Sequence, residues 1–296
     1  MPENNSNVLT VIDILRKTVS ELELSGIKDS RINAELLLCE IMKCSRLDLY
    51  INYEKPLSRD ELIQFNHYLK RRLNNEPLQY ITGRTNFFGY EIMLDRNVLI
   101  PRQETELLAE RTIEDVISSE KKNISIFEIG TGSGCLAVAL AKRLTELETG
   151  YEIFSIDISE NAIETARSNL KLNGIEDSRI TLYKKDMFEI ERLKKNYDYI
   201  ISNPPYISLD DWKELPDEIK KFEPMNALTD ESDGFKFYRK IFEIYSDKDF
   251  TGKAFCEIGF GQKETLVKIL DKYQTVKYTF YKDYSEIDRI IKLEKC

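Results

Sequence analysis

A short polar segment closes an apolar run and carries groups that could hold a planar –NH2 group. The run covers residues 197–202, and the segment after it reads Asn203-Pro204-Pro205-Tyr206. The side-chain carbonyl of Asn203 and the main-chain carbonyl of Pro204 can accept both hydrogens of an amide or aromatic amine, which turns the nitrogen lone pair toward an electrophile. Proline has a fixed φ and no N–H, so Pro205 stiffens the segment. Tyr206 offers a flat face for a planar group.

The same four residues are also typical of an ordinary turn after a strand, because Asn-Pro pairs favour turns. The tetrapeptide alone therefore leaves the chemical and the structural interpretations open. It also does not distinguish an amide from an aromatic amine, so the elements that position it must be considered next.

Helix and strand patterns alternate from about residue 104 onward, which predicts a parallel sheet with crossover helices, an α/β Rossmann-like fold. The expected strands cover residues 124–129, 151–157, 179–184 and 197–202. Residues 253–258 and 276–281, with a helix between them, are expected to supply an antiparallel edge.

The first eighty or so residues carry a different pattern, with apolar side chains at three- and four-residue steps that predict amphipathic helices. Ser58 and Glu61 have the spacing of a capping box. The basic run Lys70-Arg71-Arg72 is expected to be a solvated helix face. We predict a helical domain over residues 1–78, a β-hairpin connector over 79–101 and a catalytic domain over 102–296.

A glycine-rich turn, Gly130-Thr131-Gly132-Ser133-Gly134, is expected between the first strand of the sheet and the following helix. Glycine lets the backbone turn sharply and approach a ligand with no Cβ in the way. The spacing is GxGxG, and Cys135 stands where the dinucleotide fingerprint has its third glycine. Taken alone, this turn is weak evidence for a nucleotide site.

The next two strands also end in groups that suit an adenosyl cofactor. Asp157, followed by Ile158, lies where a ribose diol would bind, and Asp186 with Met187 offers an acid and an apolar side chain for adenine. An acid after a strand often only caps a turn. Three such features on three consecutive strands together indicate S-adenosylmethionine, and the fourth strand brings Asn203 beside its methyl group.

Methyl transfer from a sulfonium is an in-line displacement that needs alignment more than acid–base catalysis. Neither a metal nor a histidine is required for it. The one histidine, His67, falls off the apolar stripe of its predicted helix, and the five cysteines form no CxxC pair. We therefore expect no metal site.

The composition limits the partners. The formal net charge of the 296 residues is -9, and because phosphate neutralisation supplies most of the affinity for nucleic acid, we expect no stable nucleic-acid binding. No run of about 18 apolar residues occurs, so no membrane span is expected. Residues 1–7 lack the basic and apolar regions of a signal peptide. The cysteines, which form no CxxC pair, suit a reducing cytoplasm, so we expect a cytoplasmic location.

Motifs along the chain resemble the HemK/PrmC family of protein-(glutamine-N5) methyltransferases, which modify peptide-chain release factors. Residues 76–83 resemble the family's connector, residues 99–106 its IPRPETE segment, 127–140 its glycine loop and 202–207 its SNPPYI segment. The later blocks are matched by Phe222-Glu223-Pro224, Ala227-Leu228, Asp233-Gly234, and Glu257-Ile258-Gly259 with Gln262. Two departures are Gln103 in place of the usual proline and a missing glycine before Asp288-Arg289.

The resemblance implies an enzyme that methylates the glutamine of a release factor's Gly-Gly-Gln loop and leaves S-adenosyl-L-homocysteine as product. We expect it to be a monomer. The N-terminal helices would dock the release factor. The amide would be held at Asn203 and Pro204, beside Pro205 and Tyr206. The residues that would surround the cofactor are Gly130, Thr131, Gly132, Ser133, Gly134, Asp157, Ile158, Asp186, Met187 and Asn203.

Three other interpretations compete with this one. N6-adenine methyltransferases of DNA and RNA also carry NPPY, where the same acceptors hold an exocyclic amine, but the charge of -9 and the absence of an evident target-recognition domain disfavour them. A glutamine methyltransferase of a ribosomal protein is disfavoured by the wording IPRQETE. A non-enzymatic helical binding module would make the intact cofactor residues accidental.

Overall fold

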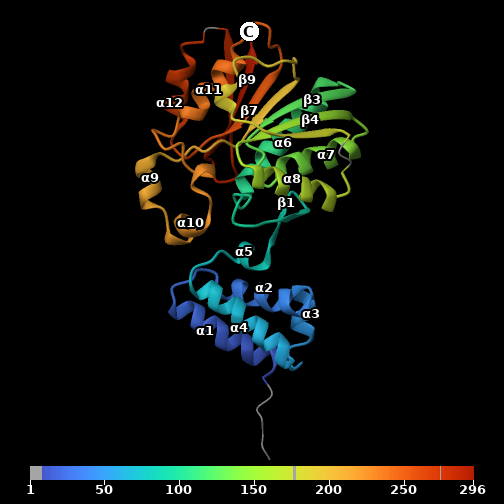
Figure 1. The fold of residues 1–296 in the computed structure, drawn as a ribbon, viewed down its shortest axis with the longest axis vertical. Helices are drawn as coiled ribbons and strands as arrows, with labels where there is room; N and C mark the ends of the chain where they lie inside the picture. The colour runs from blue at the N-terminus through green and yellow to red at the C-terminus, as the bar shows by residue number, and fades with distance from the viewer. Residues whose placement is uncertain (1–8, 176–177, 274) are drawn as a thin grey trace, which may run out of the picture. The chain divides into compact units, whose positions relative to one another are not determined.

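The computed structural model describes residues 9–175, 178–273 and 275–296 (Figure 1). The chain divides into two units: one runs up to Gly83 and also contains Asp217–Phe222, and the other contains Arg84–Pro216 and Glu223–Cys296. The expectation about a signal peptide concerns residues 1–7, which lie outside the described residues. Among the described residues, no helix has the length and apolar character needed to cross a membrane.

The first unit is helical, as the periodicity predicts. Its helices are α1 (Val11–Leu24), α2 (Ser30–Met42), α3 (Arg46–Ile51), α4 (Arg59–Leu73), α5 (Leu78–Thr82) and α10 (Asp217–Phe222). The buried side chains of Leu15, Leu38 and Phe65 belong to one hydrophobic core. The predicted capping box is present: the Ser58 hydroxyl accepts from the N–H of Glu61, and the Glu61 carboxylate accepts from the N–H of Ser58.

The expectation of a solvated basic face on α4 is wrong for Arg72, which is buried. Its Nε donates to Asn33 (2.8 Å), its Nη1 donates to the main-chain oxygen of Glu76 (2.9 Å), and it pairs with Glu218 of α10 (3.2 Å). A buried guanidinium needs its donors satisfied. Asn33 and Glu218 lie far from Arg72 in sequence, so helix periodicity could not reveal them.

A β-hairpin opens the second unit. β1 (Arg84–Phe87) and β2 (Tyr90–Met93) pair antiparallel. Asn169 holds β2 on both sides: its Oδ1 accepts from the N–H of Met93 (2.7 Å), and its Nδ2 donates to the oxygens of Met93 (2.9 Å) and Ser133 (2.8 Å). The hairpin is thereby tied to the glycine turn.

A mostly parallel sheet forms the centre of the second unit and confirms the predicted α/β class. Its strands are β3 (Asn123–Ile129), β4 (Gly150–Asp157), β5 (Ile180–Lys184), β6 (Tyr199–Ser202), β7 (Lys253–Glu257), β8 (Val276–Lys282) and β9 (Asp288–Lys295). They lie in the order β5-β4-β3-β6-β7-β9-β8. Neighbours from β5 to β7 pair parallel.

The assignment of the last strands needs correction. β7, expected in the antiparallel edge, pairs parallel with β6. The antiparallel strand is β9, which was not predicted and lies between β7 and the edge strand β8. In the loop between β8 and β9, Glu286 adopts the left-handed conformation (φ 62°), which glycine adopts more readily.

Helices cover both faces of the sheet (Figure 1). They are α6 (Gln103–Ser119), α7 (Cys135–Glu146) and α8 (Glu160–Leu172), with α11 (Lys236–Tyr245) and α12 (Lys263–Leu270) on the other side, and α9 (Leu209–Glu214) lies in the segment after β6. Phe127 and Ile129 of β3 are buried with Phe242 of α11 and Leu266 of α12. The strand order reverses between β3 and β6, and such a reversal opens a crevice at the carboxyl ends of the strands.

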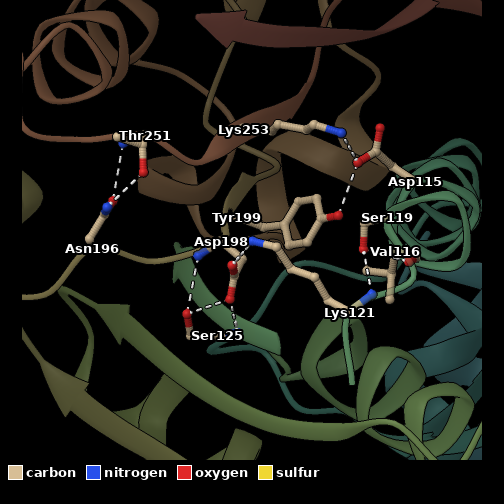
Figure 2. A network of polar contacts seen from close by, with 10 residues as sticks. All are labelled: Asp115, Val116, Ser119, Lys121, Ser125, Asn196, Asp198, Tyr199, Thr251 and Lys253. Atoms are coloured by element: carbon tan, nitrogen blue, oxygen red, sulfur yellow. Dashed lines mark hydrogen bonds and ion pairs between the residues drawn. The ribbon is translucent and has the colours of Figure 1, made fainter. Parts of the chain in front are cut away.

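A polar network fixes the start of β6 at the amino ends of the parallel strands, away from the crevice (Figure 2). Asp198 accepts from the N–H (2.7 Å) and the hydroxyl (2.8 Å) of Ser125, and it pairs with Lys121. Asp115 accepts from the hydroxyl of Tyr199 (2.9 Å) and from Lys253. Burial would raise the pKa of Asp198, but these hydrogen bonds outweigh burial and lower it. The network joins β6 to β3, β7 and α6.

We predict that Gln103→Pro stabilises the protein. Gln103 is the first residue of α6, where proline is favoured because its N–H has no helical partner. The preceding residue, Arg102, already has the extended conformation that proline requires of its neighbour (φ -97°, ψ 151°). We expect a gain of about 0.4–1 kcal/mol in the free energy of unfolding, measured by urea denaturation.

The matched control is Glu114→Pro in the middle of the same helix, where loss of a backbone hydrogen bond should cost about 3 kcal/mol. A loss of stability in the Gln103→Pro protein would contradict the assignment of this residue to the helix start.

Candidate active site

A cavity of about 340 Å³ lies at the carboxyl edge of the sheet, next to the order reversal between β3 and β6. This volume is in the range of small-molecule sites. Eleven of the predicted site residues line it: Gly130, Thr131, Gly132, Ser133, Asp157, Ile158, Asp186, Met187, Asn203, Pro204 and Pro205. Gly134 and Tyr206 are not among the lining residues.

The glycine turn presents its backbone to the cavity. The N–H groups of Gly130 (2.9 Å) and Thr131 (3.1 Å) both donate to the main-chain oxygen of Ile156, which holds the turn against β4. Gly132 has a positive φ (53°), and open space lies beyond the place where a Cβ would stand. Gly134 has a structural role, because a Cβ there would lie 2.9 Å from the Cα of Ala166 in α8.

Asp157 at the end of β4 faces this turn. Its Oδ2 accepts from the N–H of Gly132 (2.9 Å), and its Oδ1 accepts from the N–H of Ser159 (2.9 Å). Burial raises the pKa of Asp157, although the backbone hydrogen bonds oppose this. Each carboxylate oxygen keeps a lone pair that can accept from a ligand hydroxyl.

The segment after β5 lines another part of the cavity. Asp186 accepts from the N–H of Phe188 (2.9 Å) and so begins the short helix η1 (Met187–Glu189). Met187 is buried, whereas the Phe188 ring is partly exposed and lies 4.9 Å from the Nζ of Lys236. The acid and the apolar side chain therefore line the same cavity as Asp157.

Asn203 lies beside the glycine turn. The hydroxyl of Ser202 donates to the main-chain oxygen of Ile129 (2.8 Å), and a Cβ on Gly130 would lie 4.0 Å from the main-chain oxygen of Asn203. The side-chain Nδ2 of Asn203 donates to Thr105 Oγ1 (3.0 Å). The cavity therefore has the glycine turn and the Asn-Pro-Pro segment as adjacent walls.

Tyr206 lies next to the fully buried Glu257 at the end of β7. Its hydroxyl donates to Glu257 Oε1 (3.1 Å), and its main-chain oxygen accepts from the Nε2 of Gln262 (2.8 Å). The ring packs against Gly259, where a Cβ would stand 3.0 Å from the Tyr206 Cδ2. These contacts hold the end of the Asn-Pro-Pro-Tyr segment.

Two polar residues at this site received no role from the sequence. Thr105 lines the cavity, and its hydroxyl donates to Glu257 Oε2 (2.6 Å). Both residues occur in segments that resemble family blocks, and this resemblance could have pointed to them. Their contact with each other joins positions 152 residues apart, so local sequence does not reveal it. Burial raises the pKa of Glu257 and outweighs the hydrogen bonds from Thr105 and Tyr206, which lower it. The resulting pKa is about 7.

Another contact links two of the family-like segments. The guanidinium of Arg102 pairs with the buried Glu223 (2.5 Å), whose other oxygen accepts from the N–H of Ile100 (3.3 Å). This pair fixes the segment before α6 next to the cavity wall formed by Leu99 and Pro101. In the part of the chain that the structure covers, no group of three or more His, Cys, Asp or Glu residues could hold a metal ion.

Comparison with known proteins places the fold in a class. A family model described as a methyltransferase domain matches residues 120–248, and one described as the PrmC N-terminal domain matches residues 13–83. The N-terminal domain of human METTL16 has a similar fold, with a TM-score of 0.50 and 17% identity over 82% of this chain and 85% of that chain. The second unit is therefore a methyltransferase fold.

Full-length relatives define the family. The release factor glutamine methyltransferase of Chlorobaculum tepidum is 36% identical over 87% of this chain and 94% of that protein. The enzyme of the same name from Geobacter sulfurreducens is 33% identical over 96% of both chains. The chain belongs to the release factor glutamine methyltransferase family.

We predict that Glu257 makes the stability of the protein depend on pH. Its folded-state pKa of about 7 lies above its ordinary value of 4.5, so folding favours the neutral form. This stabilisation is complete below about pH 4.5 and is lost as the pH rises to about 7. The free energy of unfolding of Glu257→Gln minus that of wild type should therefore increase as the pH rises. From about pH 5 to pH 8, this difference should grow by about 2–3 kcal/mol.

The measurement is urea denaturation of both proteins across this pH range. A stability difference that stays constant with pH, or that falls as the pH rises, would contradict the raised pKa of Glu257.

Proposed function

We propose that this chain transfers a methyl group from S-adenosyl-L-methionine to the side-chain amide nitrogen (N5) of the glutamine in the Gly-Gly-Gln motif of peptide-chain release factors. The modification would modulate translation termination. The observation that carries the proposal is the similarity to release factor glutamine methyltransferases over most of the chain, at 36% identity for one of them. The amide-binding geometry at Asn203 supports it.

The residues of the cavity fit S-adenosylmethionine. The open backbone at Gly132 leaves room for a ligand, Asp157 can accept from a ribose diol, and Asp186 with Met187 can hold an adenine ring. The bound cofactor supplies an electrophilic methyl group, and S-adenosyl-L-homocysteine is the product. None of these residues requires a metal for this role.

Asn203 and Pro204 would hold the methyl acceptor. Because the Nδ2 of Asn203 donates to Thr105, its Oδ1 remains able to accept one amide hydrogen. The main-chain oxygen of Pro204 can accept the other, since both prolines lack an N–H that would compete. The two carbonyl oxygens stabilise the amide nitrogen as it becomes cationic. Pro205 and Tyr206 keep this segment rigid.

The helical N-terminal part would recognise the release factor. The match of residues 13–83 to the PrmC N-terminal domain supports this role. We keep the division into a docking domain (1–78), a hairpin connector (79–101) and a catalytic domain (102–296). We further propose that the enzyme acts as a cytoplasmic monomer without stable nucleic-acid binding, in keeping with its net charge of -9.

The two alternative methyl acceptors have less support. An adenine amine would suit the same carbonyl acceptors, and a glutamine of a ribosomal protein would suit them equally well. The matched relatives of Chlorobaculum tepidum, Fusobacterium nucleatum and Geobacter sulfurreducens all carry the name release factor glutamine methyltransferase.

We predict that purified protein incubated with methyl-labelled S-adenosylmethionine labels a peptide-chain release factor. Peptide mass spectrometry should place the methyl group on the glutamine of the Gly-Gly-Gln motif. A release factor with that glutamine replaced by alanine is the control and should stay unlabelled. Label on ribosomal protein, DNA or RNA but not on the release factor would contradict the proposed substrate.

We also predict that Asn203→Ala lowers kcat by about 100- to 1,000-fold, because one of two acceptors for the amide hydrogens is lost. The Kd for S-adenosylmethionine, measured by calorimetry, should change by less than about threefold, because other residues of the cavity hold the cofactor. The matched control is Asn161→Ala on the exposed surface of α8, which should leave kcat unchanged. An unchanged kcat in Asn203→Ala would remove the amide-binding role.

A further inference from the structure

A chain of hydrogen bonds leads from Glu257 to Asn203. When Glu257 is ionised its carboxylate can only accept, so the single proton of the Thr105 hydroxyl points toward it (2.6 Å). The Thr105 oxygen then has only lone pairs left for Asn203. It accepts from Asn203 Nδ2 (3.0 Å), and the Oδ1 of Asn203 must face away from Thr105.

We propose that Glu257, acting through Thr105, is the positioning element that selects the amide orientation in which Asn203 presents its oxygen to the substrate –NH2 group. This proposal deepens the function proposed above and rests on it. Asn203 can rotate its amide by half a turn and then present an –NH2 group. Two –NH2 groups facing each other cannot form a hydrogen bond, so the wrong orientation would block substrate binding in the reactive geometry.

The same carboxylate also holds the other end of the Asn-Pro-Pro-Tyr segment. Its Oε1 accepts from the Tyr206 hydroxyl (3.1 Å), while its Oε2 accepts from Thr105. The carbonyl of Pro204 lies in the chain between these two anchors. One buried group therefore fixes both acceptors for the amide hydrogens, which is the kind of support that precise alignment of a methyl acceptor needs.

The direction of the chain depends on the ionisation of Glu257. When the carboxyl is protonated it can donate to Thr105, whose hydroxyl is then free to donate to the Oδ1 of a rotated Asn203. The charged and titratable groups that act on this site come from several elements: Glu104 on α6, Arg289 on β9, Tyr206 in the loop after β6, Tyr238 on α11 and Cys135 on α7. Burial is the largest influence and raises the pKa of Glu257 to about 7.

The experiment compares Thr105→Val, Thr105→Ser and Thr112→Val. Thr112 is a matched control: it is also buried on α6, and its hydroxyl donates only to the main-chain oxygen of Leu108 (2.8 Å). We expect Thr105→Val to lower kcat by about 10- to 100-fold with KM for S-adenosylmethionine changed less than about twofold. Thr105→Ser should restore kcat to within about threefold of wild type, and Thr112→Val should match wild type.

The pH dependence adds a readout that a purely structural role would not change. The kcat of wild type should fall as the pH drops below about 7, because protonation of Glu257 releases the orientation of Asn203. Glu257→Gln carries no ionisable group, so its lower kcat should lack this pH-dependent limb.

A second readout needs no substrate. In protein labelled with 15N-asparagine, the side-chain amide signal of Asn203, assigned from Asn203→Ala, should shift with pH in wild type. In Thr105→Val and in Glu257→Gln it should not shift. The control Thr112→Val should behave as wild type does.

A wild-type kcat in Thr105→Val would overturn the proposal, and so would an equal loss in Thr112→Val or a pH-independent Asn203 signal in wild type. These results differ from failure of the proposed function, which appears as wild-type protein that leaves the release factor unlabelled. In that case the Asn203 signal still decides whether Glu257 sets the amide orientation.

Discussion

The parallel pairing of β6 beside β3 is the constraint on which the site depends. This register sets Ser202 opposite Ile129, so the two strands end together and their following loops become neighbours. One loop is the glycine turn and the other carries Asn203. Because the strand order reverses here, both loops open into one crevice. The polar contacts of Asp198 with Ser125 and Lys121 secure the other end of the same strand (Figure 2).

A cost in stability accompanies the precision of the site. Within the described part of the chain, no charged group donates a hydrogen bond to the Glu257 carboxyl group, and burial raises its pKa to about 7. Its two hydrogen-bond partners, Thr105 and Tyr206, are neutral groups and compensate only part of the desolvation. Sites that align reacting groups commonly contain buried titratable groups that destabilise the fold. The low dielectric environment that makes their burial unfavourable also strengthens the hydrogen bonds they form.

The sequence could predict the residues whose positions follow from strand ends. Asp157 is the last residue of a predicted strand, and Asp186 and Asn203 follow theirs within two residues. Parallel strands bring their carboxyl ends to one edge, where all three residues line the cavity. Local pattern could not predict contacts made across the fold. β9 was missed because its place between β7 and β8 is set by pairing, and Arg72 looked solvated because Asn33 and Glu218 are remote in sequence. The sequence predicted that the Tyr206 ring offers a flat face to a planar ligand. It could not reveal that the Tyr206 hydroxyl donates to Glu257.

The binding of the glutamine amide by Asn203 and Pro204 is tested most directly by a crystal structure of the protein with S-adenosyl-L-homocysteine and a peptide containing Gly-Gly-Gln. We expect the glutamine amide nitrogen to lie within hydrogen-bond distance of both Asn203 Oδ1 and the main-chain oxygen of Pro204, with Asn203 Nδ2 still donating to Thr105. A glutamine held only through its carbonyl oxygen, or an Asn203 amide rotated to present its –NH2 group, would rule out this mode of amide binding.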